Sequence, residues 1–536
     1  MIPSGLVVGW SLEKCNNDGF VFAAISNHAP LYSLTMCSPL STLGRCPPLT
    51  YGQGCHQSRL PLSTPFTSPR HTRLSPSRPQ MDAISETLRA LSPLEHHSSA
   101  QHFLSLHHNH ALTALYTLPS TLLSRIRIFS AVKAVIQQHA PLGVTILGEG
   151  TSEPRFARLK VVDLDSVVHF GTLEDGEAGD DALNKVLSSQ HSLGFVGLGT
   201  LPAWRLLVLH TQRAVKTWIS FIYHPSLCDP ASAGMFHKSL TQALQSSVST
   251  TPTDFPASRH VVRPPVAAAF PESLDELVPR SMLQQQQVGV KVFVEKVLGY
   301  VFPPPSLHHQ HQHHLHPLRR PPPPPPPPPT NGNGKKTVFS SITLPKATTR
   351  RLLAACAREN TSVTSLILAV ILRAILPSSP EAPITSGVTT DARETVEKIS
   401  SRGSATFAKY DWLKTRTHAP GEDEHFVGNV FAHAHSLSPS RSSPSSPSSP
   451  VAGNVPDLRP APTPTVVLTH AGTLDAEGIE RSVFSQSADA QGSPRWCLAR
   501  AKRGLVVGVA VPAGGRAERE VARVLEGVGR GIEELV

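Results

Sequence analysis

His224 and Asp229 are the residues of this sequence whose types and spacing best suit chemistry. They lie in the stretch FIYHPSLCDPASAGMFHKSL, residues 221–240, which begins as an apolar run, passes through a polar turn and ends in a helical pattern. A histidine can exchange a proton near neutral pH, and a carboxylate a few residues later can fix the loop that presents it. From these residues alone, the stretch is an active site, the remnant of one, or an ordinary strand–turn–helix corner.

Strands and helices alternate around this stretch. Apolar runs predict strands over 111–118, 143–149, 155–164, 204–211 and 216–224. Helical spacing of apolar residues predicts helices over 81–93, 120–140, 180–195 and 235–247, with Ser120 as the N-cap of the second. This alternation favours an α/β layered domain over an all-α or all-β one.

A second set of elements begins at residue 337. Strands are predicted over 340–344, 465–470, 482–488, 495–500 and 504–511, and helices around 352–356 and over 363–376 and 518–535. The chain therefore divides into two α/β lobes, an N-terminal one at 81–250 and a C-terminal one at 337–536.

Proline-rich segments surround and interrupt these lobes. The chain has 536 residues and 51 prolines, so much of its length cannot belong to a packed core. We predict a disordered N-terminal extension at 1–80, a Pro/His-rich linker insert at 251–336 and a Ser/Pro-rich insert at 436–454. We interpret the histidine tract at 308–316 as a flexible segment without a specific metal site. The nine prolines at 321–329 form a stiff spacer, either passive or a docking segment for an SH3 or WW domain.

Charge and cysteine content exclude several classes of protein. The net charge is +10, but the basic residues are scattered and aromatic residues make up only 6%, which argues against nucleic-acid binding. Seven cysteines without a CxxC pair indicate a reducing compartment, and we predict a cytoplasmic protein. Neither a signal peptide nor an apolar run long enough to span a membrane is expected.

Six segments, taken in order, resemble the fungal alcohol acetyltransferase-like family. They are LRALSPLEHHSSAQH, QHSLGF, PAWRLLVL, the stretch at 221–240, ITLPKATTRRLLAACARENTSVTSLILAVILRAI and VFSQSADAQGS. The family belongs to the superfamily of acyl-CoA-dependent acyltransferases and peptide-synthetase condensation domains. Over roughly residues 81–536 the resemblance implies two chloramphenicol-acetyltransferase-like lobes, each a mixed sheet flanked by helices, with a tunnel between them.

The family's active motif is HHxxxDG at the end of a strand in the first lobe. Its second histidine acts as general base on the acceptor, and its aspartate holds the loop, commonly through an arginine. In this chain His224 matches the first histidine and Asp229 the aspartate, whereas Pro225 replaces the second histidine and Pro230 the glycine. Adjacent residues of an extended segment point to opposite faces, so His224 cannot simply substitute for a histidine at 225.

Three interpretations of this departure remain open. The chain is a degenerate family member without general-base chemistry, or a bulge turns His224 into the tunnel as the base. Alternatively, another group or positioning alone supports activity. The resemblance also suggests substrate-channel roles for Gly472, Ser485 and Ser487.

Other candidates carry plainer interpretations. His102 matches a family position near the lobe entrance, and we assign it no catalytic role. Cys228 is expected to be a buried apolar residue, because no basic partner stands beside it in sequence.

The resulting hypothesis is an acyltransferase that moves an acetyl group from acetyl-CoA, its acyl-donor co-substrate, to an alcohol or amine without an acyl-enzyme. We expect it to act as a monomer and without a metal ion. The alternative is a catalytically degenerate member that binds a metabolite or a protein.

Overall fold

The protein is described here by a computed structural model. It describes residues 8–15, 19–26, 82–173, 179–211, 216–246, 260–266, 268–278, 336–375, 384–400, 406–418, 466–489 and 492–536. The chain forms two compact units, Met1–Ser75 with Arg320–Asn333 and Pro76–Arg319 with Gly334–Val536. The histidine tract, the nine prolines and the insert at 436–454 lie outside the described residues.

The first unit contains an antiparallel hairpin of β1 (Val8–Cys15) and β2 (Gly19–Ser26). This hairpin lies within the segment 1–80 for which we predicted disorder. The domain boundaries proposed from the sequence, at residues 80, 250 and 336, remain predictions.

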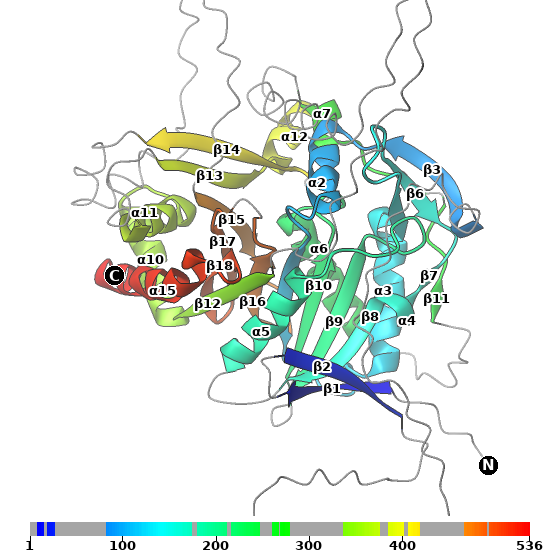
Figure 1. The fold of residues 1–536 in the computed structure, drawn as a ribbon, viewed down its shortest axis with the longest axis horizontal. Coiled ribbons are helices and arrows are strands. Elements are labelled where there is room, and N and C mark those ends of the chain that lie inside the picture. The colour runs from blue at the N-terminus through cyan, green and yellow to red at the C-terminus, as the bar shows by residue number, and fades with distance from the viewer. Residues whose placement is uncertain are drawn as a thin grey trace, which may run out of the picture. The chain divides into compact units, whose positions relative to one another are not determined.

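The second unit is built around two mixed sheets (Figure 1). The five-stranded sheet has the order β16-β4-β10-β9-β8, in which only β8 and β9 are parallel. Its strands are β4 (His110–Tyr116), β8 (Val168–Leu173), β9 (Trp204–Thr211), β10 (Thr217–Tyr223) and β16 (Ile479–Gln486). Every residue of β4 and β10 is buried, which explains their continuous apolar runs.

The six-stranded sheet has the order β12-β18-β17-β15-β13-β14. Parallel pairs join β13 to β15 and β15 to β17, and the other pairs are antiparallel. The strands are β12 (Thr337–Pro345), β13 (Ile384–Asp391), β14 (Asp411–His418), β15 (Val466–Thr473), β17 (Arg495–Ala501) and β18 (Gly504–Pro512).

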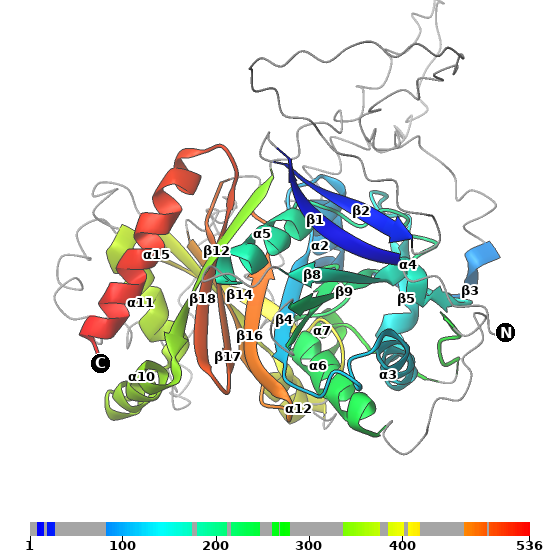
Figure 2. The same cartoon turned by 90° about the horizontal axis from the view of Figure 1, so that it is seen from below.

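Helices flank both sheets. The six-stranded sheet carries α10 (Lys346–Arg358), α11 (Val363–Ile375) and α15 (Arg516–Glu534) on its outer side (Figure 2). The apolar face of α15, with Val521, Leu525, Val528 and Ile532, is buried at helical spacing. Around the five-stranded sheet lie α3 (Arg125–Gln138), α5 (Gly179–His191) and α6 (Pro230–Ser246). The prediction of two lobes with mixed sheets flanked by helices is confirmed.

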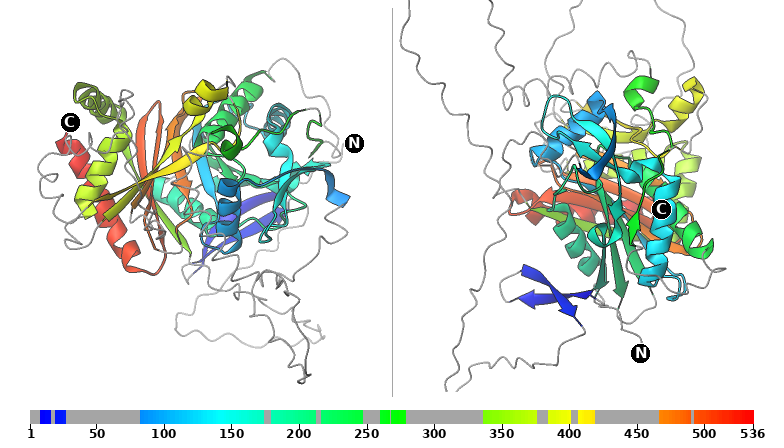
Figure 3. Two further views of the ribbon diagram at one scale, coloured as in Figure 1. Left: turned by 90° about the horizontal axis from the view of Figure 1, so that it is seen from above. Right: turned by 90° about the vertical axis from the view of Figure 1, so that its right-hand side faces the viewer.

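Two features join the lobes. Strand β16 comes from the C-terminal part of the chain but pairs with β4 in the first sheet, and it also lies beside β17 (Figure 2). Helix α6 contacts strands of both sheets, β4 and β15. In the left view of Figure 3 the two sheets lie side by side. The end of β10 and the start of α6 therefore lie where the lobes meet.

Two predicted helix starts were wrong. Residues 84–90, placed in a helix from the sequence, form β3 (Ile84–Ala90), which pairs with β6 (Arg155–Leu159) beside β5 (Val144–Leu147). The helix, α2 (Pro93–Phe103), starts after them, because Ser92 and Glu95 form a capping box and Pro93 stands in the first turn. Helix α3 begins after Ser124, not Ser120.

Part of the predicted linker belongs to the second unit. Strand β11 (Val261–Val262) pairs with β7 (Val162–Asp163), and α7 (Leu274–Leu277) contacts α2 and α12 (Arg393–Ser400). In the part of the chain that the structure describes, no single helix is long and apolar enough to cross a membrane. Among the described helices, the pair of α10 and α11 meets that length and composition, with a 102° bend between the two.

Candidate active site

The stretch from Phe221 to Leu240 is a strand–turn–helix corner. Strand β10 ends at Tyr223, and the carbonyl of His224 accepts a hydrogen bond from Leu227 N at 2.9 Å, which closes a turn. Helix α6 begins at Pro230. All residues from Phe221 to Pro230 are buried.

Both prolines of this corner suit their positions. Pro225 is the second residue of the turn that starts at His224, where its fixed φ is favoured. Pro230 is the first residue of α6, a position whose N–H has no partner within the helix, so a proline costs no hydrogen bond there. The corner therefore forms without the histidine and glycine of the family motif.

Asp229 fastens this corner to the second lobe. Its carboxylate accepts two hydrogen bonds from the guanidinium of Arg393, the first residue of α12, at 2.7 and 3.0 Å. It also accepts from the backbone N–H groups of Ser232 at 2.8 Å and Tyr410 at 2.7 Å. The side chains of Asp229 and Arg393 are 1% and 5% exposed. Burial would raise the pKa of Asp229, but Arg393 and the N–H donors outweigh it and hold the pKa below its usual value.

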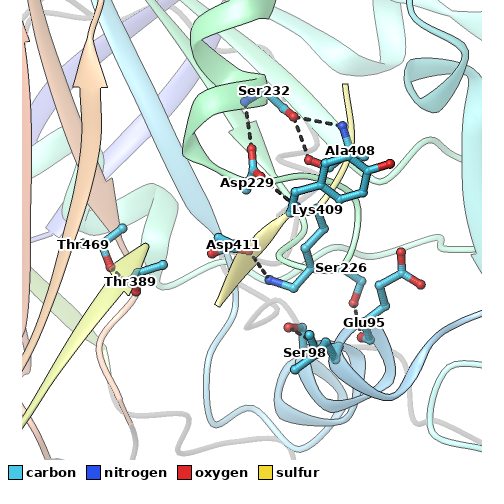
Figure 4. A network of polar contacts seen from close by, with 12 residues as sticks. Glu95, Ser98, Ser226, Asp229, Ser232, Thr389, Ala408, Lys409, Asp411 and Thr469 are labelled. Atoms are coloured by element: carbon cyan, nitrogen blue, oxygen red, sulfur yellow. Dashed lines mark hydrogen bonds and ion pairs between the residues drawn. The ribbon is translucent and has the colours of Figure 1, made fainter. Parts of the chain in front are cut away.

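Arg393 makes further hydrogen bonds in both lobes. Its Nη2 also donates to Ser232 Oγ at 2.8 Å and to the Ala408 carbonyl at 3.1 Å, and its Nη1 donates to Asp391 at 2.8 Å. The hydroxyl of Ser232 in turn donates to the Ala408 carbonyl and accepts from the Ala408 N–H (Figure 4). Arg393 and Ser232, which both bind Asp229, are therefore held in place by further hydrogen bonds.

His224 belongs to a second buried network. Its Nε2 lies 3.1 Å from Oε1 of Glu149, and His102 Nδ1 lies 3.0 Å from both oxygens of the same carboxylate. The hydroxyl of Ser99 donates to Glu149 at 3.1 Å. His224 is fully buried, and the side chain of Glu149 is 13% exposed.

The remaining ring nitrogens fix the tautomers of both histidines. His224 Nδ1 accepts a hydrogen bond from Ser226 N at 3.1 Å, and His102 Nε2 accepts one from Phe195 N at 2.9 Å. A nitrogen that accepts carries no proton, so in each neutral ring the proton lies on the nitrogen that faces Glu149. Both imidazoles therefore donate to the Glu149 carboxylate.

The pKa shifts agree with this assignment. Burial and the neighbouring His102 lower the pKa of His224 to about 4, although Glu149 opposes them. Burial would raise the pKa of Glu149, but the hydrogen bonds and charges of His102 and His224 lower it well below its usual value. At neutral pH the network holds an ionised carboxylate and a neutral His224.

The same three side chains could in principle ligate a metal, because one donor atom from each lies within 4.8 Å of the others. Metal ligation would use the lone pair on the nitrogens that face Glu149. The other nitrogen of each ring would then have to carry the proton, yet both receive a backbone N–H instead. The donor set fits a hydrogen-bonded carboxylate better than it fits a metal ion.

Glu149 was missed from the sequence. It follows β5 in a tight turn between Gly148 and Gly150, which have φ values of +66° and +81°. The ring of Phe103 lies 2.5 Å from the position of a Cβ at Gly150, so a larger residue would not fit there. The motif GEG at residues 148–150, at the end of the strand predicted over 143–149, is the signal that could have singled out this carboxylate.

Lys409 places a positive charge near Asp229 and Glu95. Its Nζ donates to Asp411 at 2.8 Å, and both side chains are 10% exposed (Figure 4). Burial would lower the pKa of Lys409, but Asp411, Asp229 and Glu95 raise it above its usual value. The lysine therefore stays charged.

Of the residues predicted to line a substrate channel, Gly472 lies in β15, Ser485 in β16 and Ser487 directly after β16. Gly472 has φ +76° at an irregularity between β15 and β17, as a tight-turn glycine would. Ser485 Oγ lies 2.8 Å from His191 Nε2, and Ser487 Oγ accepts from His108 N at 2.7 Å. Both serines are fully buried. Their roles in a channel stay a prediction.

Cys228 is fully buried, as expected. Burial, the largest cause, and the charge of Asp229 raise its thiol pKa well above the usual value. A thiol of this kind is a poor nucleophile.

Comparison with known sequences supports the resemblance. The alcohol acetyltransferase family matches residues 91–256. The probable alcohol acetyltransferase crmB of Aspergillus fumigatus is 32% identical over 205 residues, which are 36% of this chain and 44% of that protein. An uncharacterized protein of Schizosaccharomyces pombe is 30% identical over 198 residues, 37% of this chain and 40% of that protein. The chain spans less than half the length of these relatives.

Solved structures share the fold. The trichothecene 15-O-acetyltransferase TRI3 of Fusarium sporotrichioides superposes with a TM-score of 0.51 at 11% identity, covering 84% of this chain and 95% of that one. The first condensation domain of the calcium-dependent antibiotic synthetase superposes with a TM-score of 0.52 at 13% identity, covering 83% and 96%. At these identities the likeness shows the fold alone. The predicted two-lobed fold is confirmed, and residues 91–256 match the alcohol acetyltransferase family.

Proposed function

We propose that this protein transfers an acyl group, in the simplest case acetyl, from a CoA thioester to an alcohol or amine where the two lobes meet. The acceptor attacks the thioester carbonyl directly, without an acyl-enzyme. One observation carries the proposal: the loop 224–229, inside the segment that matches the family, is held against the second lobe by Asp229 and Arg393. That contact preserves the loop although Pro225 and Pro230 replace two motif residues.

His224 is then a positioning residue and not the general base. Its Nδ1 lone pair is taken by Ser226 N, and its Nε2 proton is directed to Glu149, so neither nitrogen is free to accept a proton from an acceptor. This supports the interpretation in which another group, or positioning alone, promotes the reaction. Bringing two reactants together in the right geometry is itself a large contribution to rate.

A non-catalytic binding protein is the second candidate. It is favoured by Pro225, which has no titratable group, and by the occupied nitrogens of His224. In that case the same lobes would bind a metabolite without transferring an acyl group.

Thioester consumption by the purified full chain tests the proposal. Acetyl-CoA would be supplied with a panel of primary alcohols and amines, and both free thiol and acylated product would be measured. We expect acceptor-dependent thiol release that survives His224→Gln, since glutamine can keep both hydrogen bonds of His224. No release by the wild type together with release by Pro225→His would identify a lapsed enzyme. No release by either protein would reject the proposal.

A further inference from the structure

Several buried polar atoms have no partner among the described residues, and two of them belong to directly paired strand residues next to the candidate site. These two are the hydroxyl of Tyr223 and Nδ1 of His110. Tyr223 is fully buried, and His110 is 9% exposed. Buried polar groups are nearly always hydrogen-bonded, so a pair left unbonded points to a ligand or water that completes it.

The two side chains lie next to each other on one face of the sheet. Tyr223 on β10 is directly opposite His110 on β4 in the antiparallel register, and their ring centroids are 5.6 Å apart. Gln486 on β16 is the next residue in this row. Its amide donates to the Trp496 carbonyl and to Cys497 Sγ, both on β17 of the second lobe. Tyr223, His110 and Gln486 therefore form a row across three strands that faces the junction between the lobes.

This position adjoins the corner already described. Tyr223 is the residue before His224, and the charges of Asp229 and Asp411 act on its hydroxyl. Burial raises the pKa of Tyr223 well above its usual value, and these charges add to the effect. Burial and the charge of Lys409 lower the pKa of His110 well below its usual value. At neutral pH the phenol keeps its proton and the imidazole is neutral.

A second tyrosine–histidine pair, between Tyr116 of β4 and His237 of α6, is fully bonded. The hydroxyl of Tyr116 lies 2.9 Å from His237 Nδ1, and His237 Nε2 lies 2.9 Å from the Leu112 carbonyl. All three residues are buried. A buried tyrosine of this sheet and a histidine packed against it therefore satisfy each other here, which Tyr223 and His110 do not.

We propose that Tyr223 and His110 bind the hydroxyl group of the acceptor alcohol. The phenol O–H donates to the oxygen of the alcohol, and the alcohol O–H donates to Nδ1 of His110, which requires the His110 tautomer with its proton on Nε2. A hydroxyl offers one donor and two acceptor positions and matches this pair. The inference deepens the proposed function and rests on it for the class of ligand.

Binding of 1-hexanol to the full chain, measured by titration calorimetry without acetyl-CoA, tests the site. We expect Tyr223→Phe to weaken the affinity about tenfold, which corresponds to one lost hydrogen bond of about 1.4 kcal/mol. His110→Leu should weaken it similarly, whereas His110→Asn keeps a polar atom near the Nδ1 position and should retain part of the affinity. Tyr116→Phe, the matched control, should leave the affinity unchanged.

The stability of the free protein gives an independent readout. Tyr116→Phe removes a bonded hydroxyl and should lower the urea midpoint, whereas Tyr223→Phe removes an unbonded one and should leave the midpoint unchanged or raise it. Equal 1-hexanol binding by the wild type and Tyr223→Phe, including no binding by either, would overturn the proposal. So would a loss of midpoint in Tyr223→Phe equal to that in Tyr116→Phe. Because acetyl-CoA is absent, weakened binding in a protein that shows no turnover would keep this site and reject only the proposed transfer.

Discussion

Arg393 donates from Nη1 and Nη2 to the two carboxylate oxygens of Asp229, at 2.7 and 3.0 Å. The two residues are 164 positions apart in the chain and come from different lobes. Paired donors in this fork geometry give the contact a defined orientation as well as a charge interaction. The corner that carries His224 and Pro225 therefore depends on the second lobe for its position.

Arg393→Ala should lower the free energy of unfolding by about 3–5 kcal/mol, because it leaves Asp229 as an uncompensated buried charge. Urea denaturation of the full chain measures this loss. Arg358, which is 69% exposed beside Glu359, offers the control, and Arg358→Ala should cost less than about 1 kcal/mol. Equal losses in the two variants would show that the Asp229–Arg393 contact does not hold the lobes.

Glu149→Gln should also destabilise the protein, by about 1–3 kcal/mol. The amide presents one N–H group toward two imidazoles that both donate, and neither ring can change its tautomer without losing a bond from Ser226 N or Phe195 N. Glu153→Gln is the control, since that side chain is 76% exposed, and it should change stability by less than about 0.5 kcal/mol. A Glu149→Gln protein as stable as the wild type would mean that the tautomers assigned here are wrong.

The fold should lose stability as the pH falls from 6.5 toward 4. Burial and His102 lower the pKa of His224 from 6.5 to about 4, so in this window the unfolded chain binds a proton that the folded chain does not. The stability that His224 contributes is fully present above pH 6.5 and is lost on acidification. His224→Gln removes the group that binds this proton in the unfolded chain. The slope of the unfolding free energy against pH between 5 and 6 should therefore decrease by up to about 1.4 kcal/mol per pH unit. An unchanged slope would contradict the neutral His224.

Zinc should not stabilise the protein through His102, Glu149 and His224. A metal that binds only the folded state raises the melting temperature in proportion to its saturation. Thermal unfolding with EDTA and with added ZnCl₂ should therefore give the same midpoint. A saturable rise with zinc that Glu149→Gln abolishes would show a metal site instead.

Much of the fold could be predicted from the sequence. The buried strands β9 and β10 and the amphipathic helices α5 and α15 have apolar patterns that follow their own geometry. Residues 84–90 were predicted as a helix because their apolar spacing is ambiguous. They form a strand because they pair with β6. The pairing of β16 with β4 in the first sheet joins segments distant in sequence, so no local sequence pattern predicts it.

The site was less predictable for the same reason. Asp229 could be located from its motif, since its neighbours in sequence define it. Its partner Arg393 and the network around Glu149 come from other segments, and only the folded chain brings them together. The sequence could not show whether His224 has a free lone pair, as a general base needs. Ser226 N and Glu149 bind the two ring nitrogens of His224 only in the folded chain.

Transfer of a labelled acetyl group tests the central claim most directly. The purified protein would be incubated with trideuteroacetyl-CoA and 1-hexanol, and hexyl acetate would be measured by mass spectrometry against free CoA thiol. We expect hexyl trideuteroacetate in equal amount to the thiol released, at a rate that depends on protein concentration. Thiol release without ester, or neither product with any alcohol or amine of the panel, would contradict it.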